Sequence, residues 1–347
     1  MRRSGLLKIA IVLASAAVVA YACSSTPDDP SPSLSSSWPG SMTSITVVTW
    51  NLGYGGLGEG SDFFADGGQA YLPPGPGATR ESADAIAAWL GDSGADVVLT
   101  QENARPSVIN FWTDLKGRVD RALPDHQSVF HADFQTRYLP PPLRISNGMA
   151  TYVRHGLTGS EIWPMPSDGD PYDGPLRRRY GALATAMDGP GGCWTFVNLH
   201  TSAFDEGGDL RRRQLTAILE RAAAVHAAGS RVVIGGDFNM RLVQTDFAHT
   251  TLEEHLFWVH DLPTDVLPDG WRVVADPATP TVRTNERPYR AGENYTAVID
   301  GFIVSPDVDV VSVAAADLGF RHSDHQPVRA VLRPGERPDP SACGAAR

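Results

Sequence analysis

Residues 232–240 read VVIGGDFNM, and this stretch decides how the rest of the chain can be interpreted. Its first three residues are apolar and β-branched, which predicts a short strand buried on both faces. The two glycines that follow allow a sharp bend and a close approach of other groups. Asp237 and Asn239 come next, and in extended backbone their side chains share one face. A carboxylate and an amide oxygen there suit a hard cation or a polarised water, although the same residues also fit a hydrogen-bonded turn.

The N-terminus has the composition of an export signal. Three basic residues precede an apolar run at 9–22, which is shorter than the roughly 20 residues needed to span a bilayer. We therefore assign residues 1–22 to a signal peptide. Cys23 follows directly, so the junction resembles that of a bacterial lipoprotein, in which this cysteine is lipidated and attaches the protein to the membrane. The expected location is the cell envelope, with plain secretion and a retained anchor as open alternatives.

The remainder of the chain is expected to divide into a tether, one folded domain and a tail. Residues 23–44 are rich in Ser and Pro and cannot bury enough apolar surface to fold, which predicts a disordered tether. About 300 residues follow, and they are enough for a sizeable core. We expect the folded domain over 45–335 and a C-terminal tail over 336–347.

The charge balance is acidic. The chain has 29 Lys and Arg against 40 Asp and Glu, for a net charge of −11. The predicted signal carries three bases and no acid, so the net charge of the exported part is about −14. This balance disfavours general attraction to nucleic acid, without excluding a basic patch around one cleft. We expect a monomer.

The number of cysteines is consistent with an exported protein. If Cys23 takes a lipid, Cys193 and Cys343 remain as an even pair in a compartment where disulfides persist. A bond between these two would pin the tail onto the domain. Two unrelated thiols remain the alternative.

The order of predicted elements indicates an α/β protein in which helices cover sheets. Two strand–helix–strand repeats support this. They comprise a strand at 45–50, a helix at 80–91 and a strand at 96–100, then a strand at 194–199, a helix of about 20 residues before Gly229 and the strand of VVIGGDFNM.

Other segments are predicted less directly. Further strands are expected near 127–133, 148–154, 181–187, 298–304 and 328–332, and a helix that Pro106 starts is expected over 107–122. The glycine-rich loop at 53–77 is long enough to be functional. Between two of the strands a polar loop contains Arg177, Arg178 and Arg179, which either contact a phosphate or are solvated.

Eight polar residues lie at the ends or starts of predicted strands. Each alone fits a cap or a turn. All eight are carboxylates, amides or imidazoles, and none is a lysine. Sheets that bring the same strand ends together would form one oxygen-lined, metal-binding cleft with two histidines. These residues are Asn51, Glu102, His200, Asp237, Asn239, Asp300, Asp324 and His325.

Six motifs that contain these residues resemble the endonuclease/exonuclease/phosphatase superfamily, and they occur in the family's order. They are TWNLG (49–53), TQEN (100–103), NLHTSAFD (198–205), GGDFN (235–239), IDGF (299–302) and SDHQPV (323–328). The resemblance implies that 45–335 is an α/β catalytic domain, a four-layer α-β-β-α sandwich of two mixed sheets. It also implies a metal-dependent phosphoric ester hydrolase that uses Mg²⁺, with Mn²⁺ or Ca²⁺ as alternatives.

The resemblance assigns three residues to the metal. Asn51 and Glu102 would hold the cation, with help from Asp324. Phosphoryl hydrolysis needs charge neutralisation at the non-bridging oxygens, an in-line water and help for the leaving oxygen. A metal with carboxylates, amides and imidazoles supplies all three.

The other five residues would carry out the reaction. Asp237 would orient or deprotonate the attacking water, and Asn239 would position water or phosphate. His200 would donate to a phosphate oxygen. Asp300 would orient His325, which would stabilise the pentacovalent phosphorus or act as the base. Asp237 and His325 therefore both stay candidates for the general base.

The substrate is less determined than the chemistry. We expect a phosphodiesterase or phosphomonoesterase that acts on a small or lipid-derived phosphate. A secreted or surface-tethered nuclease is the first alternative, and an inactive surface binding module on the same fold is the second. The sequence shows neither a hydrophobic hairpin of the sphingomyelinase kind nor a strongly basic face.

Overall fold

The structure is a computed structural model, and it describes residues 37–136, 143–167, 178–203 and 205–336. The predicted signal peptide, most of the predicted tether, Cys23, Arg177 and Cys343 lie outside the described residues. Cys193 is disulfide-bonded. Its pairing with Cys343 stays a prediction. Among the residues described, no helix combines the length and apolar composition that a membrane span requires.

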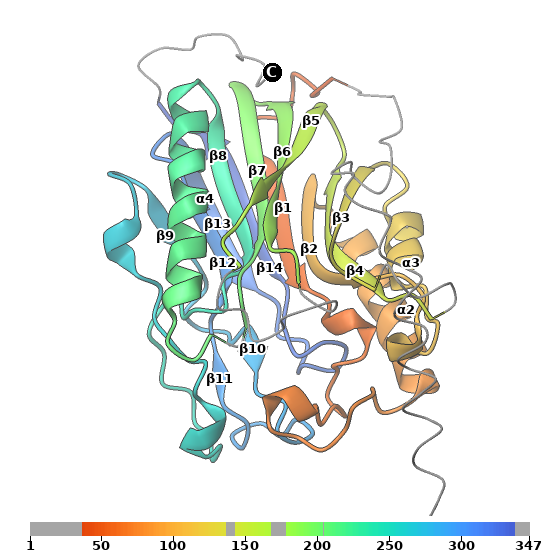
Figure 1. Ribbon diagram of the computed structural model, residues 1–347. Helices are drawn as coiled ribbons and strands as arrows, with labels where there is room; N and C mark the ends of the chain where they lie inside the picture. The colour runs from red at the N-terminus through yellow and green to blue at the C-terminus, as the bar shows by residue number, and fades with distance from the viewer. Residues whose placement is uncertain (1–36, 137–142, 168–177, 204, 337–347) are drawn as a thin grey trace, which may run out of the picture.

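Two six-stranded mixed sheets form the centre of the fold (Figure 1). The first contains β1 (Ile45–Asn51), β2 (Val97–Ala104), β3 (Gln127–Gln135), β4 (Ser146–Val153), β13 (Val308–Ala315) and β14 (Val328–Pro334). The second contains β5 (Leu157–Pro164), β6 (Gly181–Gly189), β7 (Gly192–His200), β8 (Arg231–Asp237), β9 (Arg272–Val274) and β12 (Asp300–Val304). A small separate ribbon pairs β10 (Val282–Arg283) with β11 (Thr296–Ala297).

The two sheets have similar plans. Their strand orders are β13-β14-β1-β2-β4-β3 and β5-β6-β7-β8-β12-β9. In each sheet one central pair is parallel, β1 with β2 and β7 with β8, and the other pairs are antiparallel. Parallel neighbours need a crossover connection, and helices α2 (Pro76–Asp92) and α4 (Asp209–Ala227) provide it. The two predicted strand–helix–strand repeats are therefore confirmed.

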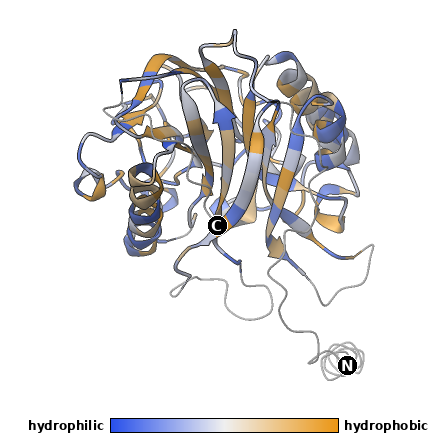
Figure 2. Cartoon of the chain, turned by 90° about the horizontal axis from the view of Figure 1, so that it is seen from above, coloured by the Kyte–Doolittle hydropathy of each residue, from blue (hydrophilic) through white to orange (hydrophobic). Residues whose placement is uncertain are grey.

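Three apolar layers hold the molecule together. Viewed end-on, α4 lies on one side of the paired sheets, and α2 and α3 (Leu115–Ala122) lie on the other (Figure 2). Between the sheets, Val47 and Leu99 of one sheet belong to the same buried cluster as Phe196, Val233 and Phe302 of the other. Separate clusters join each sheet to its helices. The predicted four-layer α-β-β-α sandwich is confirmed.

Two expectations about local structure were wrong. The helix predicted over 107–122 is divided into a short 3-10 turn, η3 (Val108–Asn110), and α3. Phe111 and Trp112 between them have φ of 49° and 56°, the left-handed conformation that ends a right-handed helix. The Asp114 carboxylate then starts α3 by accepting the Gly117 N–H at 3.0 Å.

The second wrong expectation concerned two strands at the sheet edges. The segment expected to be a polar loop before 181 contains β5, and β13 follows β12 without having been predicted. Both lie at a sheet edge, and most of their residues are exposed or half-buried. A strand with one face in water lacks the continuous apolar run that identified the central strands.

Gly236 of GGDFN should tolerate a side chain less well than a glycine in a helix does. A Cβ on Gly236 would lie 1.9 Å from the carbonyl oxygen of Leu199, a backbone atom that cannot move without breaking the β7–β8 pairing. Gly236→Ala should therefore lower the free energy of unfolding by about 1–3 kcal/mol or more. Nothing lies within 4 Å of a Cβ on Gly77 in α2, so Gly77→Ala should raise it by up to about 1 kcal/mol.

Urea unfolding of both variants measures this difference. Equal midpoints for the two alanine variants would contradict the close approach of β7 and β8.

Candidate active site

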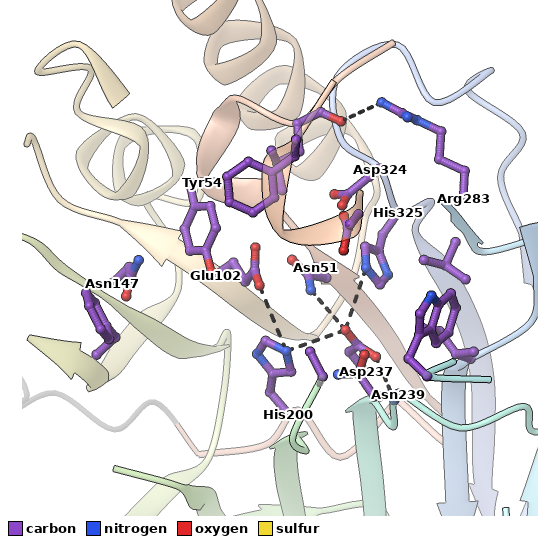
Figure 3. Close-up of a pocket in the computed structure, with 18 of the residues that line it drawn as sticks. Asn51, Tyr54, Glu102, Asn147, His200, Asp237, Asn239, Arg283, Asp324 and His325 are labelled. Carbon is purple, nitrogen blue, oxygen red and sulfur yellow. Dashed lines mark hydrogen bonds and ion pairs between the residues drawn. The ribbon is translucent and has the colours of Figure 1, made fainter. Parts of the chain in front are cut away.

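All eight predicted site residues meet at one end of the sandwich, between the two sheets. Seven of them line a cavity of about 320 Å³ (Figure 3). The eighth, Asp300, lies directly behind His325. Glu102, His200, Asp237 and His325 point toward one another, with Asn51 beside them. The sequence prediction of one shared cleft is thus matched by the geometry of these side chains.

Strand register places three of these residues in one row. In the parallel pair β7–β8, His200 is the partner of Asp237, and in the antiparallel pair β8–β12, Asp237 is the partner of Asp300. Strand partners with matching pleat present their side chains on the same face of the sheet. The ends of β7 and β8 and the start of β12 therefore bring an imidazole and two carboxylates to one edge.

Asp237 is the centre of the hydrogen-bond network. Its Oδ2 accepts from Asn51 Nδ2 at 3.0 Å, and its Oδ1 accepts from the backbone N–H of Asn239 at 2.8 Å. The same Oδ2 lies 3.6 Å from Nε2 of His200 and 3.6 Å from Nε2 of His325. One buried carboxylate thus faces two imidazoles from two different elements.

His325 and Asp300 form a buried pair. Nδ1 of His325 lies 2.9 Å from Oδ2 of Asp300. Because a carboxylate only accepts, Nδ1 carries the proton and Nε2 faces the cavity. Burial lowers the pKa of His325, but Asp300 and Asp237 outweigh it and hold this pKa well above 6.5. Burial raises the pKa of Asp300 to about 6, against the opposing effect of His325.

His200 has the opposite electrostatic environment. Burial lowers the pKa of its imidazole well below 6.5, and Arg178 and His325 lower it further. His200 is therefore neutral near pH 7. Its Nδ1 has no hydrogen-bond partner among the described residues, so nothing there fixes its tautomer.

Glu102 occupies an irregular point of β2. Its φ is 51°, and the pairing of β2 with β4 shifts register between Thr100 and Asn103. The bulge turns its carboxylate into the cavity, where Oε1 lies 3.9 Å from Nε2 of His200. Burial raises the pKa of Glu102 to about 8, with Arg178 opposing the shift and Asp324 adding to it.

Asp324 and Asn239 are held by neighbouring groups. Oδ2 of Asp324 accepts from Asn285 Nδ2 at 2.7 Å, and the Ser323 hydroxyl lies 3.3 Å from its Oδ1. Asn239 has a φ of 48°, and its Nδ2 donates to the carbonyl of Thr201 at 3.1 Å. Both side chains line the cavity in fixed orientations.

Of the three consecutive arginines, Arg178 belongs to the site. It lines the cavity, its Nε lies 3.2 Å from Asp133 Oδ2 and its terminal nitrogen lies 3.9 Å from Glu102 Oε1. Arg179 is exposed. The phosphate-contact interpretation of the run therefore rests on Arg178 among the described residues.

Several polar cavity residues were missed by sequence analysis, among them Tyr54, Asp66 and Asn147. Tyr54 and Asp66 come from the glycine-rich loop, and Asn147 comes from β4. Burial raises the pKa of Tyr54 well above 10 and that of Asp66 to about 7. Asn147 Oδ1 has no hydrogen-bond partner among the described residues. No motif contains Tyr54 or Asp66, and the only sequence feature that pointed to them was the length of the 53–77 loop.

Arg283 holds the glycine-rich loop over the cavity. This buried guanidinium donates to the carbonyls of Leu57 at 3.2 Å and Gly58 at 2.7 Å. The backbone N–H of Phe63 also donates to the carbonyl of Asn285 at 2.8 Å. The loop is therefore bonded to the segment that contains β10, and this contact closes one wall of the site.

The donor set fits a hard divalent cation. Asn51, Glu102 and Asp324 offer one amide and two carboxylates to the same cavity, and oxygen donors are what Mg²⁺, Mn²⁺ and Ca²⁺ prefer. The raised pKa of Glu102 shows that its buried charge is not fully balanced. Asp237, Asp300 and His325 form a second group whose ligand atoms lie within 4.8 Å of one another. In that group Asp300 is already bonded to His325.

Residues 48–325 match the model of the endonuclease/exonuclease/phosphatase family. The chain belongs to this family. Its members are in general divalent-metal-dependent hydrolases of phosphodiester or phosphate-ester bonds. No curated protein matches the chain in sequence.

Solved structures with the same fold are distant in sequence. An endonuclease/exonuclease/phosphatase from Beutenbergia cavernae is 20% identical, with a TM-score of 0.58 over 85% of this chain and 72% of that one. One from Bacteroides vulgatus is 15% identical, with a TM-score of 0.52 over 84% and 100%. D. rerio TDP2 complexed with single-strand DNA product is 14% identical, with a TM-score of 0.53 over 84% and 100%.

The metal assignment can be tested without an activity assay. A ligand that binds only the folded state stabilises it, by about 2.7 kcal/mol at 100 times its Kd. Mg²⁺ should therefore raise the Tm of the wild-type protein but leave Glu102→Gln almost unmoved, because the amide removes the charge that attracts the cation. Glu220→Gln, an exposed change on α4, should respond as the wild type does. An equal Mg²⁺ shift in Glu102→Gln would overturn the assignment.

Proposed function

We propose that this protein hydrolyses a phosphate ester, either a phosphodiester or a phosphomonoester, by in-line attack of a water molecule. The observation that carries this proposal is the position of the Asp237 carboxylate. Its Oδ2 lies 3.6 Å from each of two imidazole Nε2 atoms, in a cavity that Glu102 and Asp324 also line. A water held by this carboxylate would face a phosphate held by the imidazoles.

Asn51, Glu102 and Asp324 would hold Mg²⁺, with Mn²⁺ or Ca²⁺ as alternatives. When bound, the cation supplies positive charge to the non-bridging phosphate oxygens. Asn51 has a further task, since its Nδ2 also fixes Asp237. The Asn51 side chain would thus connect the residues that hold the cation with the carboxylate that activates water.

The two histidines have different tasks in this scheme. Neutral His200 would donate a hydrogen bond from Nε2 to a phosphate oxygen. His325 presents Nε2 to the same space, while Asp300 holds its Nδ1 proton. The raised pKa of His325 favours the charged form, which would stabilise the charge of the pentacovalent phosphorus; to act as the base, it would first have to lose its Nε2 proton. Asp237 and, in its neutral form, His325 remain the two candidates for the general base.

A panel of four substrates tests the function. Mg²⁺-dependent release should be measured with bis-p-nitrophenyl phosphate, a phosphomonoester, plasmid DNA and sphingomyelin, with the Glu102→Gln variant as the inactive control. We expect hydrolysis of at least one non-nucleic phosphate ester. Cleavage of DNA alone would make the protein a nuclease. No release from any substrate would favour an inactive binding module and overturn the proposal.

Asp300 and His325 should act as one unit. Asp300→Asn and His325→Ala should each lower kcat by roughly 10² or more, the contribution typical of general acid–base groups. Because Asp300 acts through His325, the double variant should lose little beyond the worse single variant. Steady-state kinetics of the three variants measure this. Additive losses, or a wild-type rate in His325→Ala, would contradict the pairing.

We also propose that the protein is exported and attached to the membrane through a lipid on Cys23. The signal-like residues 1–22 and the Ser/Pro-rich tether support this proposal. A diacylglycerol with an amide-linked acyl chain supplies more than one hydrophobic signal, enough for stable attachment. The wild-type protein should fractionate with membranes and carry a lipid mass, and Cys23→Ser should lose that mass. An unmodified mature protein beginning at Cys23 would favour plain secretion.

A further inference from the structure

Two buried amide side chains lie between the sheets, where the apolar core gives way to the candidate site. In β7, Phe196 belongs to the apolar cluster between the sheets, Asn198 follows two positions later and His200 of the site two positions after that. Side chains at this spacing in a strand share one face. In β2, Gln101 directly precedes Glu102. Asn198 and Gln101 are both 0% exposed, so each strand carries a fully buried amide just before its site residue.

The two amides join one sheet to the other. Nε2 of Gln101 donates to Oδ1 of Asn198 at 2.7 Å, and this hydrogen bond runs from β2 in the first sheet to β7 in the second. The same Nε2 lies 3.2 Å from Oγ1 of Thr49 in β1. Apolar contacts have no preferred direction, whereas a hydrogen bond weakens steeply when its angle changes. The amides therefore fix the relative position of the two sheets more sharply than the apolar cluster does.

Asn198 also binds the main chain of the opposite sheet. Its Nδ2 donates to the carbonyl of Thr100 at 3.1 Å and to the carbonyl of Ala150 at 3.0 Å. Thr100 in β2 and Ala150 in β4 are strand partners, and theirs is the last pair before the register of these two strands shifts. One side chain of the second sheet thus holds two strands of the first sheet, at the point where the bulge of β2 begins.

The bulge determines where the Glu102 carboxylate points. Glu102 lies inside it with a φ of 51°, and a non-glycine residue keeps this conformation only where its surroundings hold it. At the far end of the bulge, Nδ2 of Asn103 donates to Oγ1 of Thr100 at 3.1 Å and to the hydroxyl of Tyr152 at 3.2 Å. The bulge is therefore held at one end by side chains of its own sheet and at the other end by Asn198.

We propose that Asn198 is a positioning residue, which fixes the bulge of β2 so that Glu102 faces the site in the orientation that binds the cation. Glu102 stands on the first sheet and His200 on the second, with 3.9 Å between Oε1 and Nε2. A site of this kind needs its groups held to within about 0.5 Å. Asn198 meets this need because it bonds the bulge from the strand that also carries His200. The role of the cation rests on the proposed function, whereas the support of the bulge does not.

A role in stability alone would give a different result. Amides that only joined the sheets would lower the free energy of unfolding when replaced, with no special effect at the bulge. Groups that orient a metal ligand change the affinity for the metal as well, typically by 10–100-fold. Local exchange at the bulge and affinity for the cation therefore separate the two roles, provided that a control variant loses stability without losing these hydrogen bonds.

The test compares Asn198→Leu, which keeps a similar volume and removes three hydrogen bonds, with Phe196→Leu, a packing change on the same face of β7. Amide hydrogen exchange of the metal-free proteins is measured for residues 99–104, relative to exchange in β8, which corrects for any overall loss of stability. This ratio should rise roughly tenfold in Asn198→Leu and stay at the wild-type value in Phe196→Leu. Calorimetric titration should show that Mg²⁺ binds about 10–100-fold more weakly to Asn198→Leu only.

Gln101→Met keeps the proposal testable if Asn198→Leu does not fold. It removes the hydrogen bond between the sheets but leaves both carbonyl contacts of Asn198 in place. Its affinity for Mg²⁺ should therefore fall by a smaller factor than that of Asn198→Leu. An affinity equal to that of the wild type in Gln101→Met would then overturn the proposal.

Two results in Asn198→Leu would overturn the positioning role: a wild-type exchange ratio at 99–104, or faster exchange there with unchanged affinity for Mg²⁺. An equal loss of affinity in Phe196→Leu would also overturn it, because the effect would then be one of stability. Hydrolysis of bis-p-nitrophenyl phosphate by the wild-type protein is measured in parallel. Mg²⁺ binding that depends on Asn198, without any hydrolysis, would mean that only the proposed function fails. Hydrolysis by the wild type together with normal Mg²⁺ affinity in Asn198→Leu would mean that only the positioning fails.

Discussion

The register between β7, β8 and β12 is the constraint on which the site depends. It sets Asp237 opposite His200 across one pair and opposite Asp300 across the other. A slip of one residue would send these side chains to the other face of the sheet. Gly236 permits the register, since any larger residue would collide with the Leu199 carbonyl. Gly236 thus helps to set the geometry of the candidate site even though it carries no reactive group.

The site concentrates features that cost stability. Buried carboxylates and imidazoles lose hydration, and their attraction for one another recovers only part of it. Tyr54, Glu102 and Asn239 also have positive φ, which non-glycine residues adopt rarely. Such strain persists where the surrounding structure holds it, and it is common at active sites. Here the bulge in β2, the register of β8 and the loop held by Arg283 provide that support.

The polar residues of the site and the loops around the cavity belong to different parts of the fold. The former lie at strand ends, where the hydrogen-bonded sheets fix their positions. The latter lie between strands and tolerate changes in sequence and length more readily. One fold can therefore keep its reaction and change its substrate, and fold similarity alone says nothing about which phosphate ester is bound.

The sequence by itself determined the central strands, the crossover helices and the eight polar residues at strand ends. Those features are local, because an apolar run or a helical period is encoded in neighbouring residues. The tertiary structure alone decided that Arg178, Asp66 and Asn147 enter the cavity. These depend on which loops pack together, and no short segment records contacts between residues far apart in the chain. The edge strands β5 and β13 were missed for a related reason, since a neighbour strand rather than their own pattern makes them strands.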